Sequence, residues 1–183
     1  MLNEELHTDV TIFTSSGSVG AHRAVLASRS PVFNSMFHHD LMEKQSSTVH
    51  INDMTLESCR ALLRYLYGNL EHEEFQKHRA ALVRASHKYD ILDLKDVCEE
   101  SLIEDTDVHN VLERLHDGWL YELVRLKREC LHYLFEFGKI HDLREEFNEF
   151  LREADRDLVV ELVQEQLNFL TNSWLPASMA TTS

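Results

Sequence analysis

Histidine and cysteine are the residues of this chain whose side chains could bind a metal or act as nucleophiles, and the sequence holds 12 of the first and 3 of the second. His38 and His39 are adjacent, and neighbouring residues on a helix do not face one direction. His72 and His78 lie near glutamates but lack a ligand spacing such as HExxH. The sequence therefore predicts no metal site and no cofactor, and at most a mild pH sensitivity.

The three cysteines, Cys59, Cys98 and Cys130, are far apart and form no CxxC pair. This pattern predicts buried, reduced thiols in a protein of the cytoplasm or nucleus, rather than a zinc or redox site. The chain also has no GxSxG segment and no glycine-rich phosphate loop. We therefore expect a protein that is not an enzyme.

The formal net charge is −14. An acidic surface repels phosphate backbones, so direct binding of nucleic acid is not expected. No apolar run approaches membrane-spanning length, and the acidic residues 1–6 do not resemble a signal peptide. The expected partners are proteins, and the negative field could steer a basic one towards the chain.

Strands are expected only in the first third of the chain. Residues 9–14 alternate between two faces and are rich in β-branched and aromatic side chains. Residues 15–18 are typical of a turn, after which residues 19–21 predict the second strand of a hairpin. A third short strand is predicted at Thr48–Ile51.

Helices are expected in most of the remaining sequence. After a short helix at 22–28, Ser30 is predicted to cap the next helix and Pro31 to occupy its first position. Asp53 or Thr55 is predicted to cap a helix that ends at Gly68.

From residue 106 onward only helices are predicted. Thr106 is a plausible cap, Gly118 is predicted to end or bend the first of these helices, and the second is placed at Leu120–Phe137. Further helices are predicted at 143–151 and 158–170. This order predicts an α+β domain with a small sheet, followed by an α-helical extension.

Several segments of the first hundred residues resemble the BTB/POZ family in order and spacing. They are Asp9–Phe13, Ala21–Ser28, Ser30–Phe37, Leu63–Gly68 and Ala85–Lys95. Residues 106–170 resemble the helical extension, known as the 3-box or BACK-like region, of adaptors that bind cullin-3. The whole chain is similar to plant speckle-type BTB/POZ proteins, without the MATH-type substrate-binding domain that many of them carry.

The resemblance implies a BTB/POZ domain at 1–104, a helical BACK-like extension at 105–172 and a flexible tail at 173–183. It also implies a homodimer that serves as a substrate-specific adaptor of a cullin-3 RING ubiquitin ligase and binds an unknown protein substrate. Two alternatives remain open. One is an oligomerisation scaffold or transcriptional co-regulator that binds no cullin, and the other is a truncated adaptor that captures no substrate.

The resemblance suggests a cullin contact in and after the helix that carries Phe37. In the family this contact is a hydrophobic–any–Glu motif, to which Leu41 and Glu43 correspond. An exposed apolar anchor and a charge at its rim would provide affinity and register. The alternative is an ordinary polar loop. The residues expected to bind cullin are Phe37, His39, Leu41, Met42 and Glu43.

The resemblance also implies a charged pocket near the dimer interface, where the family places an acid and a base at this spacing. Here the two flank a hairpin that could bring them within pairing distance. The alternative is a structural ion pair that only preserves local geometry. The residues assigned to this pocket are Leu6, Asp9, Arg23 and Val25.

Two features of the helical extension each have two interpretations. An apolar stripe is predicted to be core packing rather than a partner groove. The acidic stretch from Asp142 to Glu165 is predicted to be a solvated helix face, with attraction of a basic partner as the alternative. The stripe consists of Leu120, Leu123, Leu126, Cys130, Leu134 and Phe137.

Overall fold

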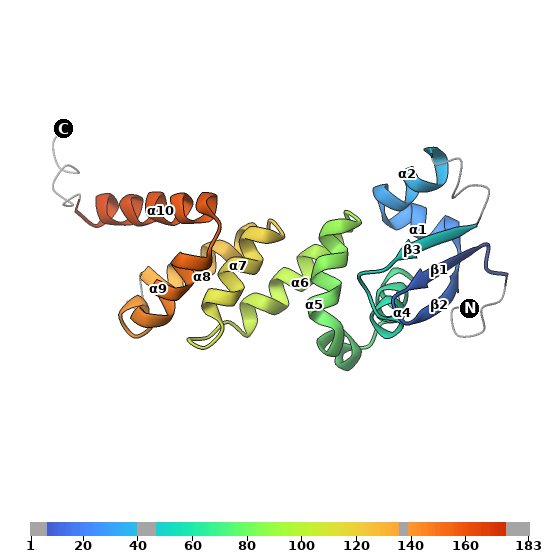
Figure 1. The fold of residues 1–183 in the computed structure, drawn as a ribbon, viewed down its shortest axis with the longest axis horizontal. Helices are drawn as coiled ribbons and strands as arrows, with labels where there is room; N and C mark the ends of the chain where they lie inside the picture. Colours follow the sequence, from blue (N-terminus) through green and yellow to red (C-terminus); the bar gives the residue numbers. More distant parts are fainter. Residues whose placement is uncertain (1–6, 40–46, 136–138, 175–183) are drawn as a thin grey trace, which may run out of the picture. The chain divides into compact units, whose positions relative to one another are not determined.

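The structure is a computed structural model that describes residues 7–39, 47–135 and 139–174. The chain forms two compact units, Met1–Glu99 and Glu100–Ser183 (Figure 1). Of the polar loop predicted at residues 40–47, only Ser47 is described, and the tail predicted at 173–183 lies outside the described residues from Leu175 onward.

The first unit is built on a three-stranded sheet with the strand order β2-β1-β3. Strand β1 (Val10–Thr14) pairs antiparallel with β2 (Gly17–Ala21) and parallel with β3 (Thr48–Ile51). The alternation predicted for β1 is confirmed: Val10 and Ile12 are buried, whereas Phe13 is exposed and stacks on His50 of β3.

The hairpin turn is tighter than the sequence predicted. Thr14 pairs with Gly17, so β2 begins two residues before Val19 and only two serines lie between the strands. The hydroxyl of Thr14 also donates a hydrogen bond to the carbonyl of Gly17 (2.9 Å), which closes the turn.

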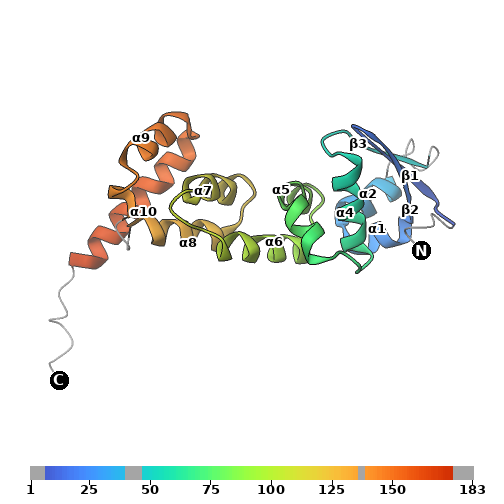
Figure 2. The same cartoon turned by 90° about the horizontal axis from the view of Figure 1, so that it is seen from below.

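Five helices of the described chain follow or flank this sheet, and α4 lies beside it in both views (Figures 1 and 2). The last of them, α6, continues past residue 99 into the second unit. Their side chains supply most of the first unit's core, which includes Leu26, Phe33, Leu62, Leu82 and Ile91. The helices are α1 (Arg23–Arg29), α2 (Pro31–His39), α4 (Leu56–Leu66), α5 (His72–Lys88) and α6 (Leu92–Glu104).

Ser30 separates α1 from α2 and caps α2, as predicted. Its buried hydroxyl accepts a hydrogen bond from the backbone N–H of Phe33 (3.1 Å) and donates one to the carbonyl of Tyr89 (2.5 Å). The ring of Phe33 stacks on the ring of Tyr89, with centroids 4.5 Å apart. The start of α2 is thereby held against the segment that follows α5.

Of the two caps considered for α4, the structure selects Thr55. Its hydroxyl accepts a hydrogen bond from the backbone N–H of Ser58 (3.2 Å). Asp53 instead accepts one from Lys88 (2.7 Å). The inward stripe of α4 includes Cys59, Leu63 and Leu66, all buried.

The second unit contains α7 (Val111–Leu120), α8 (Val124–Phe135), the short helix η2 (Lys139–His141), α9 (Arg144–Glu153) and α10 (Arg156–Trp174). No helix of the described chain is both long and apolar enough to cross a membrane.

Two boundaries predicted in this unit are wrong. Thr106 does not cap α7: its hydroxyl donates to the carbonyl of Leu102 (2.7 Å) at the end of α6, and α7 begins only at Val111. Leu120 belongs to α7, because the chain reverses at Glu122, which adopts a left-handed φ of 55°.

Gly118 does not end its helix, which continues to Leu120, so this part of the prediction is wrong. It lies buried inside α7, where a Cβ atom would approach the backbone nitrogen of Lys127 in α8 to 3.1 Å. The missing side chain therefore lets α7 and α8 pack closely.

The apolar stripe is mainly core, as predicted, since Leu123, Leu126, Cys130 and Leu134 are buried. Leu120 is exposed, and Phe137 lies outside the described residues.

Replacing Ser30 by alanine removes both the cap of α2 and the donor to the Tyr89 carbonyl. We expect the free energy of unfolding in urea to fall by about 2 kcal/mol, the sum of a lost cap and a lost buried hydrogen bond. The matched control is Ser28→Ala. Among the described residues, the hydroxyl of exposed Ser28 bonds only the carbonyl of Val25 in its own helix (2.9 Å). It should change stability by less than about 0.5 kcal/mol. An equal decrease in the free energy of unfolding in the two variants would contradict the role given to Ser30.

Candidate interaction sites

The structure brings Asp9 and Arg23 together at the start of α1. A carboxylate oxygen of Asp9 accepts a hydrogen bond from the backbone N–H of Arg23 (2.7 Å). His22, the residue at the N-cap position, makes no side-chain cap of its own. Asp9 therefore supplies the acceptor and a negative charge where a helix favours them.

The guanidinium group of Arg23 links α1 to the end of α2. It lies over the ring of Phe37, 5.3 Å from the centroid, and donates a hydrogen bond to the hydroxyl of Ser47 (3.3 Å). Val25, the other described member of the predicted pocket, is half-buried in α1. Leu6 lies outside the described residues. These contacts of Asp9 and Arg23 join elements within a single chain.

Phe37 is buried, with 8% of its surface exposed, and it stacks on Phe33. A side chain this enclosed offers little area to a partner, so its contribution is to fix the end of α2. His39 is the last residue of α2, and its side chain is not described. Leu41, Met42 and Glu43 lie outside the described residues.

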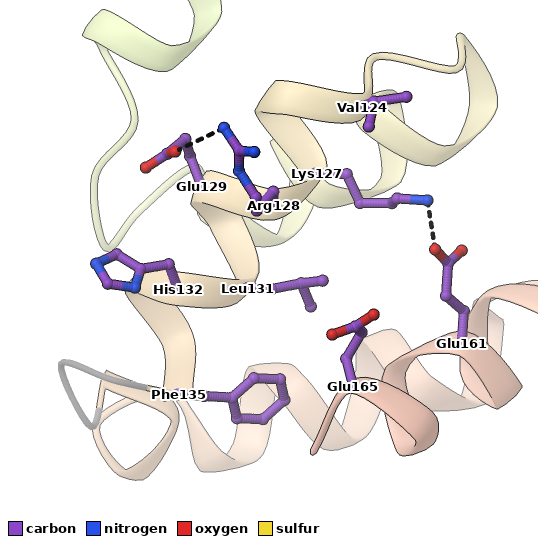
Figure 3. Close-up of a pocket in the computed structure, with 9 residues that line it drawn as sticks. All are labelled: Val124, Lys127, Arg128, Glu129, Leu131, His132, Phe135, Glu161 and Glu165. Carbon is purple, nitrogen blue, oxygen red and sulfur yellow. Dashed lines mark hydrogen bonds and ion pairs between the residues drawn. The ribbon is translucent and has the colours of Figure 1, made fainter. Parts of the chain in front are cut away.

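Sequence reasoning missed a groove between α8 and α10 in the second unit (Figure 3). Its cavity volume is about 540 Å³. Lys127 of α8 forms an ion pair with Glu161 of α10, which joins the two walls. The apolar part comes from α8, and Val124 at its start is 68% exposed. The lining residues are Val124, Lys127, Arg128, Glu129, Leu131, His132, Phe135, Glu161 and Glu165.

A weak sequence signal for this groove exists. Lys127, Leu131 and Phe135 recur every four residues and so share one face of α8, as Glu161 and Glu165 do on α10. The two faces belong to segments about thirty residues apart, and only the fold shows that they meet.

The outer side of α10 also exposes apolar side chains, namely Val160, Val163 and Leu167. Their i, i+3, i+7 spacing places them on one stripe, while Leu158 and Leu162 face the core. An uncovered stripe of this kind is typical of proteins that contact other proteins.

Residues 1–106 match the sequence model of the BTB/POZ domain. The chain belongs to the BTB/POZ family. The family assignment predicted from the sequence segments is thus confirmed, and so is the BTB fold with a helical C-terminal extension. BTB/POZ domains are protein-interaction modules that in general self-associate, and the family is generally non-enzymatic.

Two similar plant proteins come from Arabidopsis thaliana. BTB/POZ domain-containing protein At1g21780 is 61% identical over 168 residues, which are 92% of this chain and 52% of the relative. BTB/POZ domain-containing protein At1g55760 is 55% identical over 168 residues, or 92% and 51% of the two chains. The chain therefore spans about half the length of these relatives.

Similarity extends to animals. Protein maternal effect lethal 26 of Caenorhabditis elegans is 34% identical over 135 residues, which are 73% of this chain and 34% of the relative. A BTB/POZ protein of this kind is expected to act through its surfaces, which directs attention to the end of α2 and to the α8–α10 groove.

Two histidines of the BTB unit bond to neighbouring hydroxyl groups. Nδ1 of His22 lies 2.6 Å from the hydroxyl of Tyr67, and Nδ1 of His78 lies 3.2 Å from that of Ser58. Within residues 7–39, 47–135 and 139–174, no group of three or more His, Cys, Asp or Glu side chains is arranged to hold a metal.

All three cysteines are buried and free of disulfides, so the prediction of buried thiols is confirmed. Burial raises the pKa of each thiol to about 12. Because the thiolate is the reactive form, these side chains are poor nucleophiles at neutral pH.

Replacing Asp9 by alanine should lower the free energy of unfolding by about 1 kcal/mol, because the N–H of Arg23 loses its acceptor. Asp9→Asn should lower the free energy of unfolding by less, since the amide keeps an acceptor oxygen at the same place. Urea denaturation measures both. The molar mass from light scattering should stay unchanged, because the described contact of Asp9 lies within one chain. Equal destabilisation by alanine and asparagine would show that the capping role is wrong.

In the folded protein, the cysteines should not react with a thiol-specific disulfide reagent at about pH 8, which is near the ordinary thiol pKa. All three should react once guanidinium chloride unfolds the chain. Since the folded pKa values exceed those of the unfolded thiols, stability should be fully present below about pH 8.5 and decline as pH rises towards 12. Rapid labelling of a folded cysteine would contradict this assignment.

Proposed function

We propose that the chain is a substrate-specific adaptor subunit of a cullin-3 RING ubiquitin ligase, acting in the cytoplasm or nucleus. The adaptor performs no chemistry itself. It brings a protein substrate close to the ubiquitin carrier that the ligase recruits, and proximity raises the rate of transfer. The observation that carries the proposal is the sequence Leu41-Met42-Glu43, which follows α2 of a BTB/POZ domain within two residues.

The packing of α2 supports this assignment. Ser30 fixes its first turn, Phe33 stacks on Tyr89, and Phe37 is enclosed under Arg23. Because α2 is held at both ends, the segment that follows it starts from a fixed position. Binding then costs less conformational entropy than it would from a loosely held helix.

The motif residues have complementary roles in such a contact. Leu41 would supply an apolar side chain that loses water on binding, and Glu43 a charge that selects register. Self-association of the BTB domain would place two such contacts in one assembly. A second contact raises avidity through effective concentration without any new interaction at the first.

The double variant Leu41→Asp with Glu43→Ala tests this function. It introduces a charge at the apolar anchor and removes the acid, so we expect pull-down of cullin-3 by the full chain to be lost. Circular dichroism should remain unchanged, because the contacts of Ser30 and Phe33 that hold the start of α2 are not altered.

The matched control is Lys44→Ala with Gln45→Lys, which moves one charge within the same segment and, like the motif variant, leaves the net charge unchanged. It should retain cullin-3. Retained binding by the motif variant would overturn the proposal and favour a BTB scaffold that recruits other proteins without cullin.

A further inference from the structure

The groove between α8 and α10 has an apolar floor and charged walls (Figure 3). Val124, Leu131 and Phe135 form the floor along α8 at positions i, i+7 and i+11. At 1.5 Å per residue these positions span about 16 Å of helix. Such a floor is longer than one side chain, and it matches about five residues of an extended peptide.

Most charges of the groove are already engaged. Lys127 pairs with Glu161, and Arg128 lies 3.7 Å from Glu129. His132 has an interaction of its own. No hydrogen bond or ion pair joins Glu165 to any residue whose side chain the structure describes. Within its described lining, the groove thus presents one available carboxylate.

The position of Glu165 is informative. Its carboxylate lies on the α10 side of the groove and points towards Leu131, with Phe135 nearby (Figure 3). A ligand group placed here meets a negative charge at one end and aliphatic and aromatic carbon at the other.

Lysine and arginine side chains have this combination. Their aliphatic stems lie well along apolar surfaces while the cationic head stays at a polar rim. The head would bind Glu165 by a charge-assisted hydrogen bond, and the ring of Phe135 offers a further attraction to a cation. The net charge of −14 also favours a basic ligand over an acidic one.

We propose that the α8–α10 groove is a docking site for a partner protein that inserts a lysine or arginine side chain flanked by apolar residues. The basic side chain pairs with Glu165, and the flanking apolar residues cover Leu131 and exposed Val124. The extended apolar floor selects a peptide segment over a free polyamine, which carries charge but no apolar side chains. The site does not depend on the proposed cullin contact, which involves the first unit.

Methyl and amide NMR of the full chain tests the site with a defined probe. The probe is a capped peptide, Leu-Ser-Lys-Ser-Leu, in which lysine and both leucines share one face of an extended chain. It is compared with the same peptide carrying glutamate in place of lysine. The lysine peptide should cause saturable shifts at Leu131, Phe135 and Glu165. The glutamate peptide should not.

Two variants of exposed glutamates separate specific pairing from general attraction. Glu165→Gln should weaken the lysine peptide about tenfold, as expected for the loss of one charge-assisted contact. Glu149→Gln on α9 changes the net charge equally but lies away from the groove, and should leave the affinity unchanged. Glu165→Lys should reverse the preference and favour the glutamate peptide.

The proposal is overturned if the lysine peptide gives no saturable shifts in the groove, or if the two glutamine variants weaken it equally. It is also overturned if spermidine perturbs the same residues as strongly as the peptide. None of these results bears on cullin binding, so failure here is distinguishable from failure of the proposed function.

Discussion

The buried hydroxyl of Ser30 is the interaction on which the BTB unit's proposed contact depends. It satisfies two polar groups at once, the N–H of Phe33 and the carbonyl of Tyr89. Because buried polar groups are costly when unpaired, this arrangement holds α1 and α2 in one position relative to the end of α5. The Phe33–Tyr89 stack covers the same junction with apolar carbon. The segment proposed to bind cullin therefore leaves a helix whose start is fixed by both kinds of contact.

Close packing has a comparable role in the helical unit. Gly118 lets α7 approach α8 at the backbone of Lys127, and the same lysine pairs through its side chain with Glu161 of α10. One face of α8 is thus committed to the core through Leu126, Cys130 and Leu134. The neighbouring face is left to form the groove. The contacts proposed for the two units differ in chemistry: the first would use the apolar Leu41 in the sequence that follows α2, and the second a groove with an available carboxylate.

The sequence predicted those features that depend on neighbouring residues. Alternation identified β1, and the Ser30-Pro31 pair identified the start of α2, because both are local signals. The predictions for Thr106 and Gly118 were wrong because each residue type has more than one role in a helix. Threonine can bond a carbonyl of the preceding turn instead of capping the next helix. Glycine inside a helix can allow close packing instead of ending the helix. The groove could not be predicted, because it requires α8 and α10 to meet. The proposed cullin contact rests on family resemblance and on the sequence that follows α2.

Titration calorimetry of the purified chain with the purified N-terminal region of cullin-3 tests the central claim most directly. An adaptor should give a saturable binding isotherm with one cullin per chain, and the two proteins should co-elute in size-exclusion chromatography. Absence of binding heat together with separate elution would contradict the account.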